Sequence, residues 1–367
     1  MRGTTTRAKE HWASRDPRRA EPWARCRECV RAALSALLAV ILAPSLSHAE
    51  GWDGPTTGPR GVTDKRIIVV AEDMRNDGIG GVVNGINEAA GALGWLVTVL
   101  DAAGSPTDLP SVLRAAVSDE AAADGVILVG LDAVRGMPDY GARAEARHLP
   151  VVGWHVGPQP GPVASTPVAV NVTTDPRIVA RLAADTAIEQ SNGHAGVAIL
   201  TDYRYAIAVV KARGMANRIK TCAQCTLLEI VDLPLSDSGR RMSAEIARLR
   251  EQYGERMTDI LAINDLYFDD AVGDLRREGV AHEALSLISA GDGSPSAIER
   301  IRDDEYQTAT VAEPLALQAW QLVDELNRLL AHEPISGFVA APYLVTRAAP
   351  VPALADFRAI YRRIWQR

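Results

Sequence analysis

The 367-residue sequence lacks the short motifs that carry the common hydrolytic and nucleotide-dependent chemistries. It has no Gly-x-Ser-x-Gly nucleophile turn, no His-Glu-x-x-His zinc motif and no Gly-x-x-x-x-Gly-Lys-[Ser/Thr] phosphate loop. Its seven histidines are scattered, and two of them lie within the first 48 residues. We therefore expect no catalytic residue, no metal and no cofactor.

A partial glycine pattern follows the first expected strand. Residues 78–83 read Gly-Ile-Gly-Gly-Val-Val, and Asp101 ends the second strand. A dinucleotide-binding fingerprint has a third glycine where this chain has Val83, and a tight turn where it has the loop 72–79. These two departures argue against a dinucleotide-dependent enzyme.

Cysteine is scarce, with four residues in the whole chain. Cys26 and Cys29 lie near the N-terminus, which leaves Cys222 and Cys225 as an isolated Cys-x-x-Cys pair. A zinc site needs about four ligands, and beyond residue 49 no second cysteine pair or histidine pair is present. In an oxidising compartment the pair predicts a local disulfide between a helix end and the next strand. A redox or metal motif is the alternative.

Basic charge is concentrated at the N-terminus. Nine Lys and Arg residues precede residue 32, an apolar run occupies residues 30–46, and Ser-His-Ala follows at 47–49. This order predicts a secretory signal cleaved after Ala49. An uncleaved membrane anchor is the alternative, but the run is shorter than the roughly 20 residues of a membrane span, and Pro44 interrupts it.

Beyond residue 49 the balance of charge is acidic. Of the 39 basic and 46 acidic side chains, nine and four lie in residues 1–49, so 30 and 42 remain and the net charge is −12. Nucleic acids and anionic membranes require a basic surface, so both are unsuitable partners. We expect a periplasmic monomer, long enough for two domains with separate cores.

Short apolar runs alternate with helical patterns from residue 65 onward. These runs are apolar on both faces, as is typical of parallel strands covered by helices on both sides. The Gly/Pro-rich segment 157–162 interrupts the alternation, which then restarts. The pattern predicts an α/β protein with two doubly wound parallel-sheet lobes. Strands are expected at 67–71, 95–100, 125–129, 151–154, 169–172, 196–200, 227–231, 260–263 and 285–289.

A long amphipathic helix is expected at 315–330, after the second α/β block. Since the first lobe lacks helices on one face, we expect the chain to return there and then to cross again. The predicted N-terminal lobe is 64–157 plus 313–334, and the predicted C-terminal lobe is 158–312 plus 335–348. Residues 50–63 are expected to be a flexible start, and 349–367 a C-terminal tail.

Polar and aromatic side chains directly follow strands in both lobes. In open α/β sheets, ligands bind at the carboxyl ends of the strands. Aromatic rings beside carboxylates and amides suit a polyhydroxylated ligand, although each Asp or Asn alone is explained equally well as a helix cap. Their occurrence at six strand ends favours binding. The expected ligand-binding residues are Asp73, Asn76, Trp154, His155, Tyr203, Tyr205, Asn264, Asp265, Asp292 and Glu313.

Three segments of the second block carry a family resemblance. Residues 263–265 read Ile-Asn-Asp, 289–295 read Ser-Ala-Gly-Asp-Gly-Ser-Pro, and 308–314 read Thr-Ala-Thr-Val-Ala-Glu-Pro. In order and spacing they resemble the Asn-Asp, Gly-Asp-Gly and Ala-Thr-x-Ala-Gln segments of periplasmic sugar-binding proteins of ribose-binding type. That class I fold is shared with LacI-type regulator cores. The resemblance covers nearly all of 64–348.

The resemblance implies a site and a hinge. Asn264 or Asp265, Asp292 and Glu313 should line the cleft between the lobes. Three crossovers, near 156–168, 312–315 and 334–338, should form the hinge.

Two positions depart from that family's pattern. The Asp-Arg pair that pentose and hexose binders carry after Pro150 is absent, because residues 151–156 read Val-Val-Gly-Trp-His-Val. The crossover glutamine is Glu313. The pocket thus loses a cation and gains an anion, which favours a sugar held differently, a polyol, or a ligand bearing an amine.

By this resemblance the chain is a periplasmic solute-binding protein that closes around a small polar ligand and delivers it to an ABC-type permease. Two alternatives remain open. One is a periplasmic sensor that presents its closed form to a sensor kinase or chemoreceptor, and the other is an exported α/β enzyme of unrecognised type. A transcription regulator would need a DNA-binding helix pair before the first strand, where this chain has a signal and a Gly/Pro segment.

Overall fold

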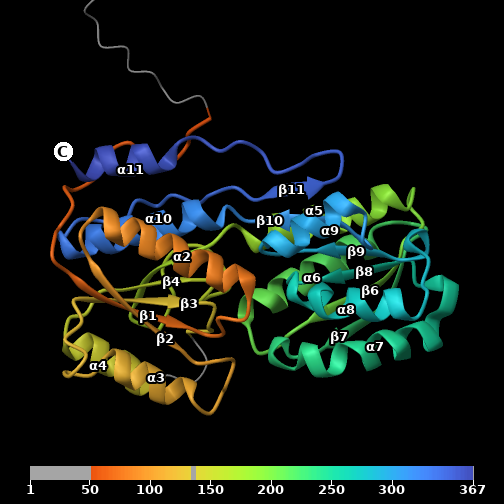
Figure 1. The fold of residues 1–367 in the computed structure, drawn as a ribbon, viewed down its shortest axis with the longest axis horizontal. Helices are drawn as coiled ribbons and strands as arrows, with labels where there is room; N and C mark the ends of the chain where they lie inside the picture. The colour runs from red at the N-terminus through yellow and green to blue at the C-terminus, as the bar shows by residue number, and fades with distance from the viewer. Residues whose placement is uncertain (1–50, 134–137, 367) are drawn as a thin grey trace, which may run out of the picture. The chain divides into compact units, whose positions relative to one another are not determined.

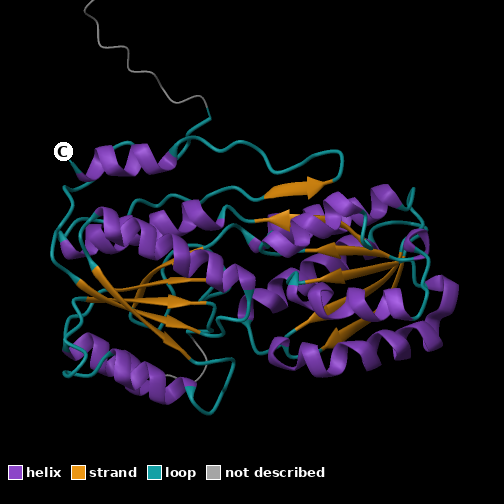
Figure 2. Ribbon diagram, in the orientation of Figure 1, coloured by secondary structure: helices purple, strands orange, loops and turns teal. Residues whose placement is uncertain are grey.

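The computed structural model describes residues 51–133 and 138–366, which belong to one compact unit, Gly51–Arg367. Two separate sheets organise this unit, each flanked by helices (Figures 1 and 2). The expected fold class of two doubly wound lobes is thereby confirmed. The predicted signal, 1–49, lies outside the described residues. In the described part of the chain, no helix has the length and apolar character needed to cross a bilayer.

Lobe one is built on a five-stranded parallel sheet in the order β2-β1-β3-β4-β5. Alternate residues of β1 point to opposite faces, as the pleat of a strand requires. Val69 packs in the core beneath α2 and α10, whereas Val70 packs in the core beneath α3 and α4. The strands are β1 (Arg66–Ala71), β2 (Leu96–Asp101), β3 (Gly125–Val129), β4 (Val151–Trp154) and β5 (Val168–Val172), and the helices are α2 (Asp77–Ala92), α3 (Leu109–Ala116), α4 (Pro138–Ala146) and α10 (Leu315–Leu330).

Lobe two is built on a six-stranded sheet in the order β11-β10-β9-β8-β6-β7. Its strands are parallel except β11, which pairs antiparallel with β10. The strands are β6 (Gly196–Thr201), β7 (Thr226–Asp232), β8 (Asp259–Ala262), β9 (Ser286–Ser289), β10 (Gln307–Ala312) and β11 (Tyr343–Thr346). The helices are α5 (Pro176–Gln190), α6 (Ala206–Lys220), α7 (Ser238–Tyr253), α8 (Leu266–Arg277) and α9 (Pro295–Asp303).

The boundary between the lobes is not where the sequence predicted it. The strand expected to open lobe two, β5, pairs in parallel with β4 of lobe one. The Gly/Pro-rich segment is a loop of lobe one, because the buried Asn171 side chain donates to the carbonyl oxygens of Gly157 and Gln159 and accepts from Val156 N. The chain therefore first crosses from lobe one to lobe two at 173–175, and not at 156–168 as predicted.

The next two crossovers are close to the expected places, at 313–314 and 331–342. A further connection was not expected: after β11 the chain returns to lobe one and forms α11 (Phe357–Trp365) in the predicted tail. Trp365 stacks on Trp320 of α10 with a ring-centroid distance of 5.3 Å, and its Nε1 donates to Asp324 Oδ1 at 2.8 Å. The tail is therefore part of the lobe-one core.

The start of the described chain, expected to be flexible, is held against α10 and α11. Arg328 Nη2 donates to Thr57 O at 2.7 Å, and Val62 N donates to Asn327 Oδ1 at 2.8 Å. Gly61 N donates to Trp365 O at 2.8 Å. Because α10 buries polar side chains, they need hydrogen-bond partners, and the segment 57–62 supplies them.

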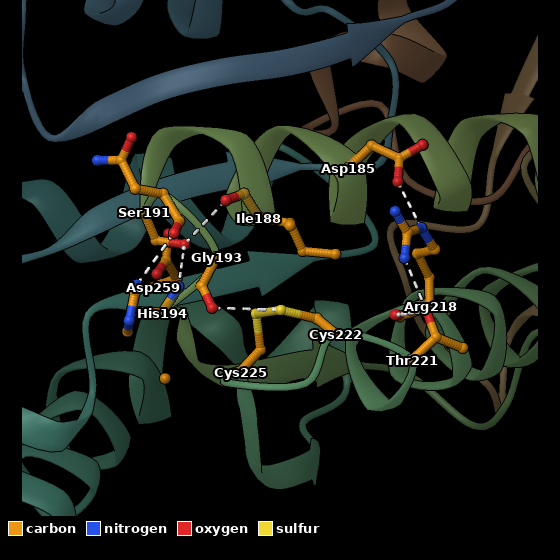
Figure 3. The surroundings of a disulfide bond; sticks show 12 residues. Asp185, Ile188, Ser191, Gly193, His194, Arg218, Thr221, Cys222, Cys225 and Asp259 are labelled. Atoms are coloured by element: carbon orange, nitrogen blue, oxygen red, sulfur yellow. Dashed lines mark hydrogen bonds and ion pairs between the residues drawn. A yellow bond between two sulfur atoms is a disulfide. The ribbon is translucent and has the colours of Figure 1, made fainter.

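Cys222 and Cys225 form a disulfide between the end of α6 and the start of β7 (Figure 3). Cys222 Sγ also lies 3.3 Å from the carbonyl oxygen of Gly193, in the turn between α5 and β6. The bond thus fastens one end of α6, the helix whose other end reaches the cavity described next.

Candidate functional site

A cavity of about 50 Å³ lies between the two lobes, at the carboxyl ends of both sheets. Lobe one contributes residues that follow β1, β3 and β4, and lobe two contributes residues that follow β6, β8 and β9. Loops converge at this edge of a parallel sheet, which is where open α/β folds bind ligands. Six predicted site residues line the cavity: Asn76, Trp154, His155, Tyr205, Asn264 and Asp292.

Glu313 lies at the second crossover and is fully enclosed by groups from both lobes. Its Oε1 is 3.0 Å from His155 Nε2 and 3.5 Å from Lys211 Nζ. Its Oε2 accepts from Gln318 Nε2 at 3.0 Å and from Thr174 N, in the first crossover, at 3.2 Å. Burial alone would raise the pKa of Glu313, but the charges of His155 and Lys211 outweigh burial and hold that pKa well below its usual range.

The Trp154 and His155 rings are stacked, with centroids 3.7 Å apart and planes inclined by 10°. Trp154 Nε1 donates to Gln318 Oε1 at 2.9 Å, while the amide nitrogen of Gln318 donates to Glu313. Since one end of the amide accepts and the other donates, the Gln318 side chain has a single satisfying orientation. The two rings are thus fixed by the same network as Glu313.

Asp292 is only 2% exposed and lines the cavity from the Gly-Asp-Gly loop of lobe two. Its Oδ2 accepts from Asn264 Nδ2 at 2.6 Å, whereas its Oδ1 has no hydrogen-bond partner among the described residues. Burial raises the pKa of Asp292. Gly78 of lobe one lies so close that a Cβ there would collide with Oδ2, so the approach of α2 depends on glycine.

The first turn of α6 bridges to lobe one. The Tyr205 hydroxyl donates to Glu72 Oε1, and Ala206 N donates to Asp132 Oδ2 at 2.8 Å. Burial raises the pKa of Glu72, against the opposing effect of the hydrogen bond from Tyr205. These bonds join the lobes beside the cavity.

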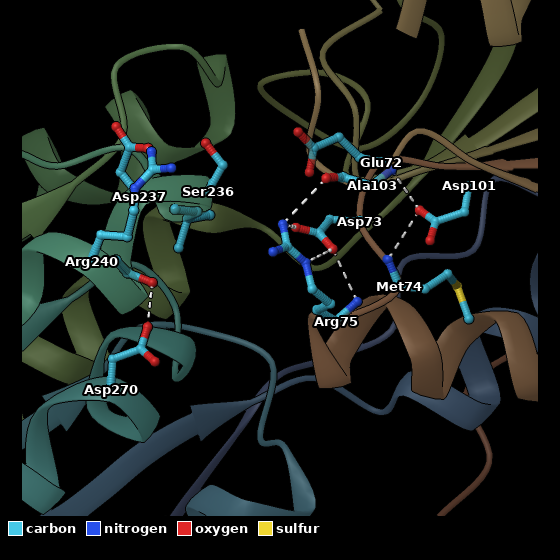
Figure 4. Close-up of polar contacts among 12 residues, drawn as sticks. Glu72, Asp73, Met74, Arg75, Asp101, Ala103, Ser236, Asp237, Arg240 and Asp270 are labelled. Carbon is cyan, nitrogen blue, oxygen red and sulfur yellow. Dashed lines mark hydrogen bonds and ion pairs between the residues drawn. The ribbon is translucent and has the colours of Figure 1, made fainter. Parts of the chain in front are cut away.

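Four predicted site residues do not line the cavity: Glu313, which lies behind His155, and Asp73, Tyr203 and Asp265. Asp73 pairs with Arg75, its Oδ2 lying 2.6 Å from Arg75 Nη2 (Figure 4), and Tyr203 is 40% exposed. Asp265 accepts from Gly293 N, Ser294 N, Gln307 Nε2 and Thr310 Oγ1. Asp265 therefore holds the 291–294 loop in place, and its side chain makes no capping hydrogen bond to α8, the helix that follows it.

Lys211 is one of two charged lining residues that were not predicted from the sequence. It is 3% exposed and lies on the buried face of α6 with Ile207, Ala208 and Met215. The sequence does indicate this position, because a lysine four residues after Ile207 falls on the otherwise apolar stripe of the helix. Glu72 also lines the cavity and was not among the predicted site residues.

His155, Asp292 and Glu313 each place one ring nitrogen or carboxylate oxygen within 4.8 Å of those of the other two, a grouping of the kind that can hold a metal ion. However, the Lys211 ammonium already lies beside Glu313 and would repel a divalent cation. The arrangement is better suited to hydrogen bonding with an organic ligand.

A family model described as a periplasmic binding protein domain matches residues 67–334. No curated protein matches the chain. A solute-binding protein of an ABC transporter from Agrobacterium vitis, with bound allitol, is similar in structure, with 18% identity and a TM-score of 0.65 over 78% of this chain and 96% of that one.

Two further solved structures are similar. The periplasmic component of an ABC-type sugar transport system from Hahella chejuensis has 17% identity and a TM-score of 0.67, over 77% of this chain and 99% of that one. A periplasmic solute-binding protein from Actinobacillus succinogenes, with bound D-allose, has 15% identity and a TM-score of 0.65, over 78% of this chain and 98% of that one. These likenesses establish a shared fold.

Proposed function

The chain belongs to the periplasmic binding protein domain family, and we propose from this that it captures one small polyhydroxylated ligand between its lobes. The family and the structural neighbours are solute-binding proteins rather than enzymes. The observation that carries the proposal is the cavity shared by both lobes, with Asn76 and His155 on one side and Tyr205, Asn264 and Asp292 on the other.

The chemistry of the lining supports a sugar or polyol. Asn76, Asn264 and Asp292 offer amide and carboxylate groups, while Trp154 and Tyr205 add aromatic surface for C–H groups. The structural neighbours were solved with allitol, D-allose and myo-inositol. Because the ligand contacts both lobes only when they close, binding favours the closed form.

The proposed role is capture in the periplasm and delivery to an ABC-type permease of the inner membrane. The predicted signal at 1–49 supports export. A strain lacking this protein should lose uptake of the radiolabelled ligand once that ligand is known, and complementation should restore it. Unchanged uptake would contradict the transport role.

Binding is tested by a thermal-shift screen of the purified protein against sugars, polyols and amino sugars, with amino acids as a contrasting panel. At least one polyhydroxylated compound should raise the melting temperature, because a ligand specific for the folded state stabilises it by mass action. Asp292→Ala should weaken binding of that compound by roughly tenfold, since it removes a lining acceptor, whereas Glu251→Gln on the exposed face of α7 should not. The absence of any shift across the polyhydroxylated panel would refute the proposal.

A further inference from the structure

Building on the proposed function, we propose that the ligand is a polyhydroxylated compound bearing a protonated amine, with its ammonium group bound at Asp292. The inference rests on the charge balance of the cavity, on the unpaired oxygen of Asp292 and on the way neighbouring cations are already paired.

Anionic groups outnumber cationic groups around the cavity. Glu72 and Asp292 line it, and Glu313 lies directly behind His155. The only lysine or arginine on the cavity wall described by the structure is Lys211, which is 3.5 Å from Glu313 and neutralises that carboxylate. Even if His155 is counted as protonated, three carboxylates face two cations.

The nearby arginines do not correct this imbalance. Arg75 donates through Nε and Nη2 to both carboxylate oxygens of Asp73, at 2.9 and 2.6 Å. Arg204 pairs in the same way with Asp202, also at 2.9 and 2.6 Å. In each case a guanidinium and a carboxylate two residues apart form a bidentate pair, so neither arginine supplies a spare positive charge to the cavity.

Asp292 is the carboxylate that needs a partner. One oxygen accepts from Asn264, and the other, Oδ1, is buried at the cavity wall without a hydrogen-bond donor among the described residues. Burial makes its negative charge unfavourable and raises the pKa of Asp292, although the charges of His155 and Lys211, which Glu313 shares, act in the opposite direction. An ammonium group supplies both a hydrogen-bond donor and the compensating charge, whereas a neutral hydroxyl supplies only the donor.

Anionic ligands and metal ions fit this balance less well. A ligand carboxylate would face Glu72 and Asp292, while the one lining lysine is already paired with Glu313. A divalent ion between His155, Asp292 and Glu313 would lie close to the ammonium group of Lys211. An amine placed at Asp292 instead faces a buried carboxylate oxygen that has no hydrogen-bond donor among the described residues. The other such oxygen, Glu313 Oε1, is already ion-paired with His155 and Lys211.

The test uses compounds that differ only in an amine replacing a hydroxyl: glucosamine and glucose, glucamine and glucitol, serinol and glycerol. Isothermal titration at neutral pH should show, in at least one pair, the amine binding roughly tenfold tighter than its neutral partner, because only the protonated amine forms an ion pair with the carboxylate. Asp292→Asn, which keeps the side-chain shape, should abolish that preference. Glu251→Gln, an equivalent charge removal on exposed α7, should leave it intact.

The possible outcomes separate this inference from the proposed function. Neutral partners that bind as tightly as the amines in every pair would overturn the amine inference and leave the proposed function standing. If no sugar, polyol or amine binds, the proposed function falls and the inference falls with it. Stabilisation by zinc chloride alone that is lost in Asp292→Asn would overturn the inference in favour of a metal site.

A pH series on the unmodified protein decides the matter if Asp292→Asn does not fold. Burial raises the pKa of both Glu72 and Asp292, so these carboxylates take up protons as the pH is lowered. Protonation removes the charge that attracts the ammonium, and the amine should therefore bind more weakly at low pH, with less change for its neutral partner. Amine affinity that is constant or rises with falling pH would overturn the inference.

Discussion

The buried carboxylate of Glu313 is central to the molecule because it contacts both lobes and the first crossover. It lies beside His155 of lobe one, Lys211 of lobe two and the backbone N–H of Thr174. A buried ion pair is strongly destabilised when only one member is removed, since the other is left without compensation. The lysine and the glutamate are therefore best regarded as one unit.

Glu313→Gln should lower the free energy of unfolding by about 3–5 kcal/mol, because Lys211 would be left buried beside a neutral amide. Urea denaturation measures the change. The double variant Lys211→Met with Glu313→Gln should recover much of this loss. A single variant within about 1 kcal/mol of wild type would show that the pair contributes little.

Asp259 is buried at the start of β8. We expect its effect on the free energy of unfolding to change with pH in the opposite sense to that of an ordinary ion-paired carboxylate. Burial raises its pKa to about 6, against the opposing hydrogen bond from Thr258. A raised carboxylate pKa means that the folded state binds more protons, so stability falls as the pH rises from about 4 to about 6 and stays low above that range.

Asp259→Asn should flatten this part of the stability profile and, at pH 7, stabilise the protein by up to about 2 kcal/mol. The measurement is urea denaturation of both proteins between about pH 4 and pH 7. Asp265, whose pKa burial also raises to about 6, should remain responsible for part of the slope. Identical slopes in the two proteins would exclude Asp259 as a contributor.

At the scale of residues, the site was predictable where side chains follow strands. Asn76, Asn264 and Asp292 fall at strand ends, and all three line the cavity. Asp265 falls at a strand end too, but its oxygens are used by the neighbouring loop, and only the structure shows that competition. Lys211 lies within α6, so a search of the residues that follow strands does not find it.

At the scale of elements, α11 is the part whose role was least expected. Its apolar residues recur at helical spacing, at Phe357, Ile360, Tyr361, Ile364 and Trp365, so the sequence does carry the signal of an amphipathic helix. Which surface this face covers depends on α10, more than 25 residues earlier in the chain. Strand positions were easier to predict from the sequence: β3 begins and ends where the apolar run at 125–129 predicted.

Trp365→Ala should destabilise the protein by about 3–5 kcal/mol, because it removes a buried ring stacked on Trp320 and the bond to Asp324. Ligand affinity should be unchanged, since α11 does not line the cavity. Arg363→Ala, on the exposed face of the same helix, is the control. If both variants unfold at the same urea concentration as wild type, α11 is dispensable for stability.

At the scale of the whole molecule, the resemblance to periplasmic sugar-binding proteins is confirmed by the family match and the shared fold. The lobe boundary was misplaced because a Gly/Pro-rich segment is typical of a linker, whereas 157–162 is held within lobe one by Asn171. The pairing of β5 with β4 is a tertiary contact that strand propensity does not encode.

Closure of the lobes should depend on the hydrogen bond between Tyr205 and Glu72. Tyr205→Phe removes the donor to a buried carboxylate, and we expect it to favour the open form and to weaken ligand binding about fivefold. Small-angle scattering should show a larger radius of gyration for the unliganded variant than for unliganded wild type. Tyr253→Phe, which removes a hydroxyl bonded to Glu229 within lobe two, is the matched control. Equal radii for Tyr205→Phe and wild type would show that this bond does not influence closure.

The return of α11 to lobe one has a practical consequence for measuring motion. Both the segment 57–62 and α11 are fastened to α10, so a surface linker or dye attached beyond α11 is carried by lobe one alone. The main chain passes between that anchored body and lobe two at the crossovers. A second dye on an exposed position of α7 would then report lobe rotation directly, as a change in energy transfer, without restraining the moving part.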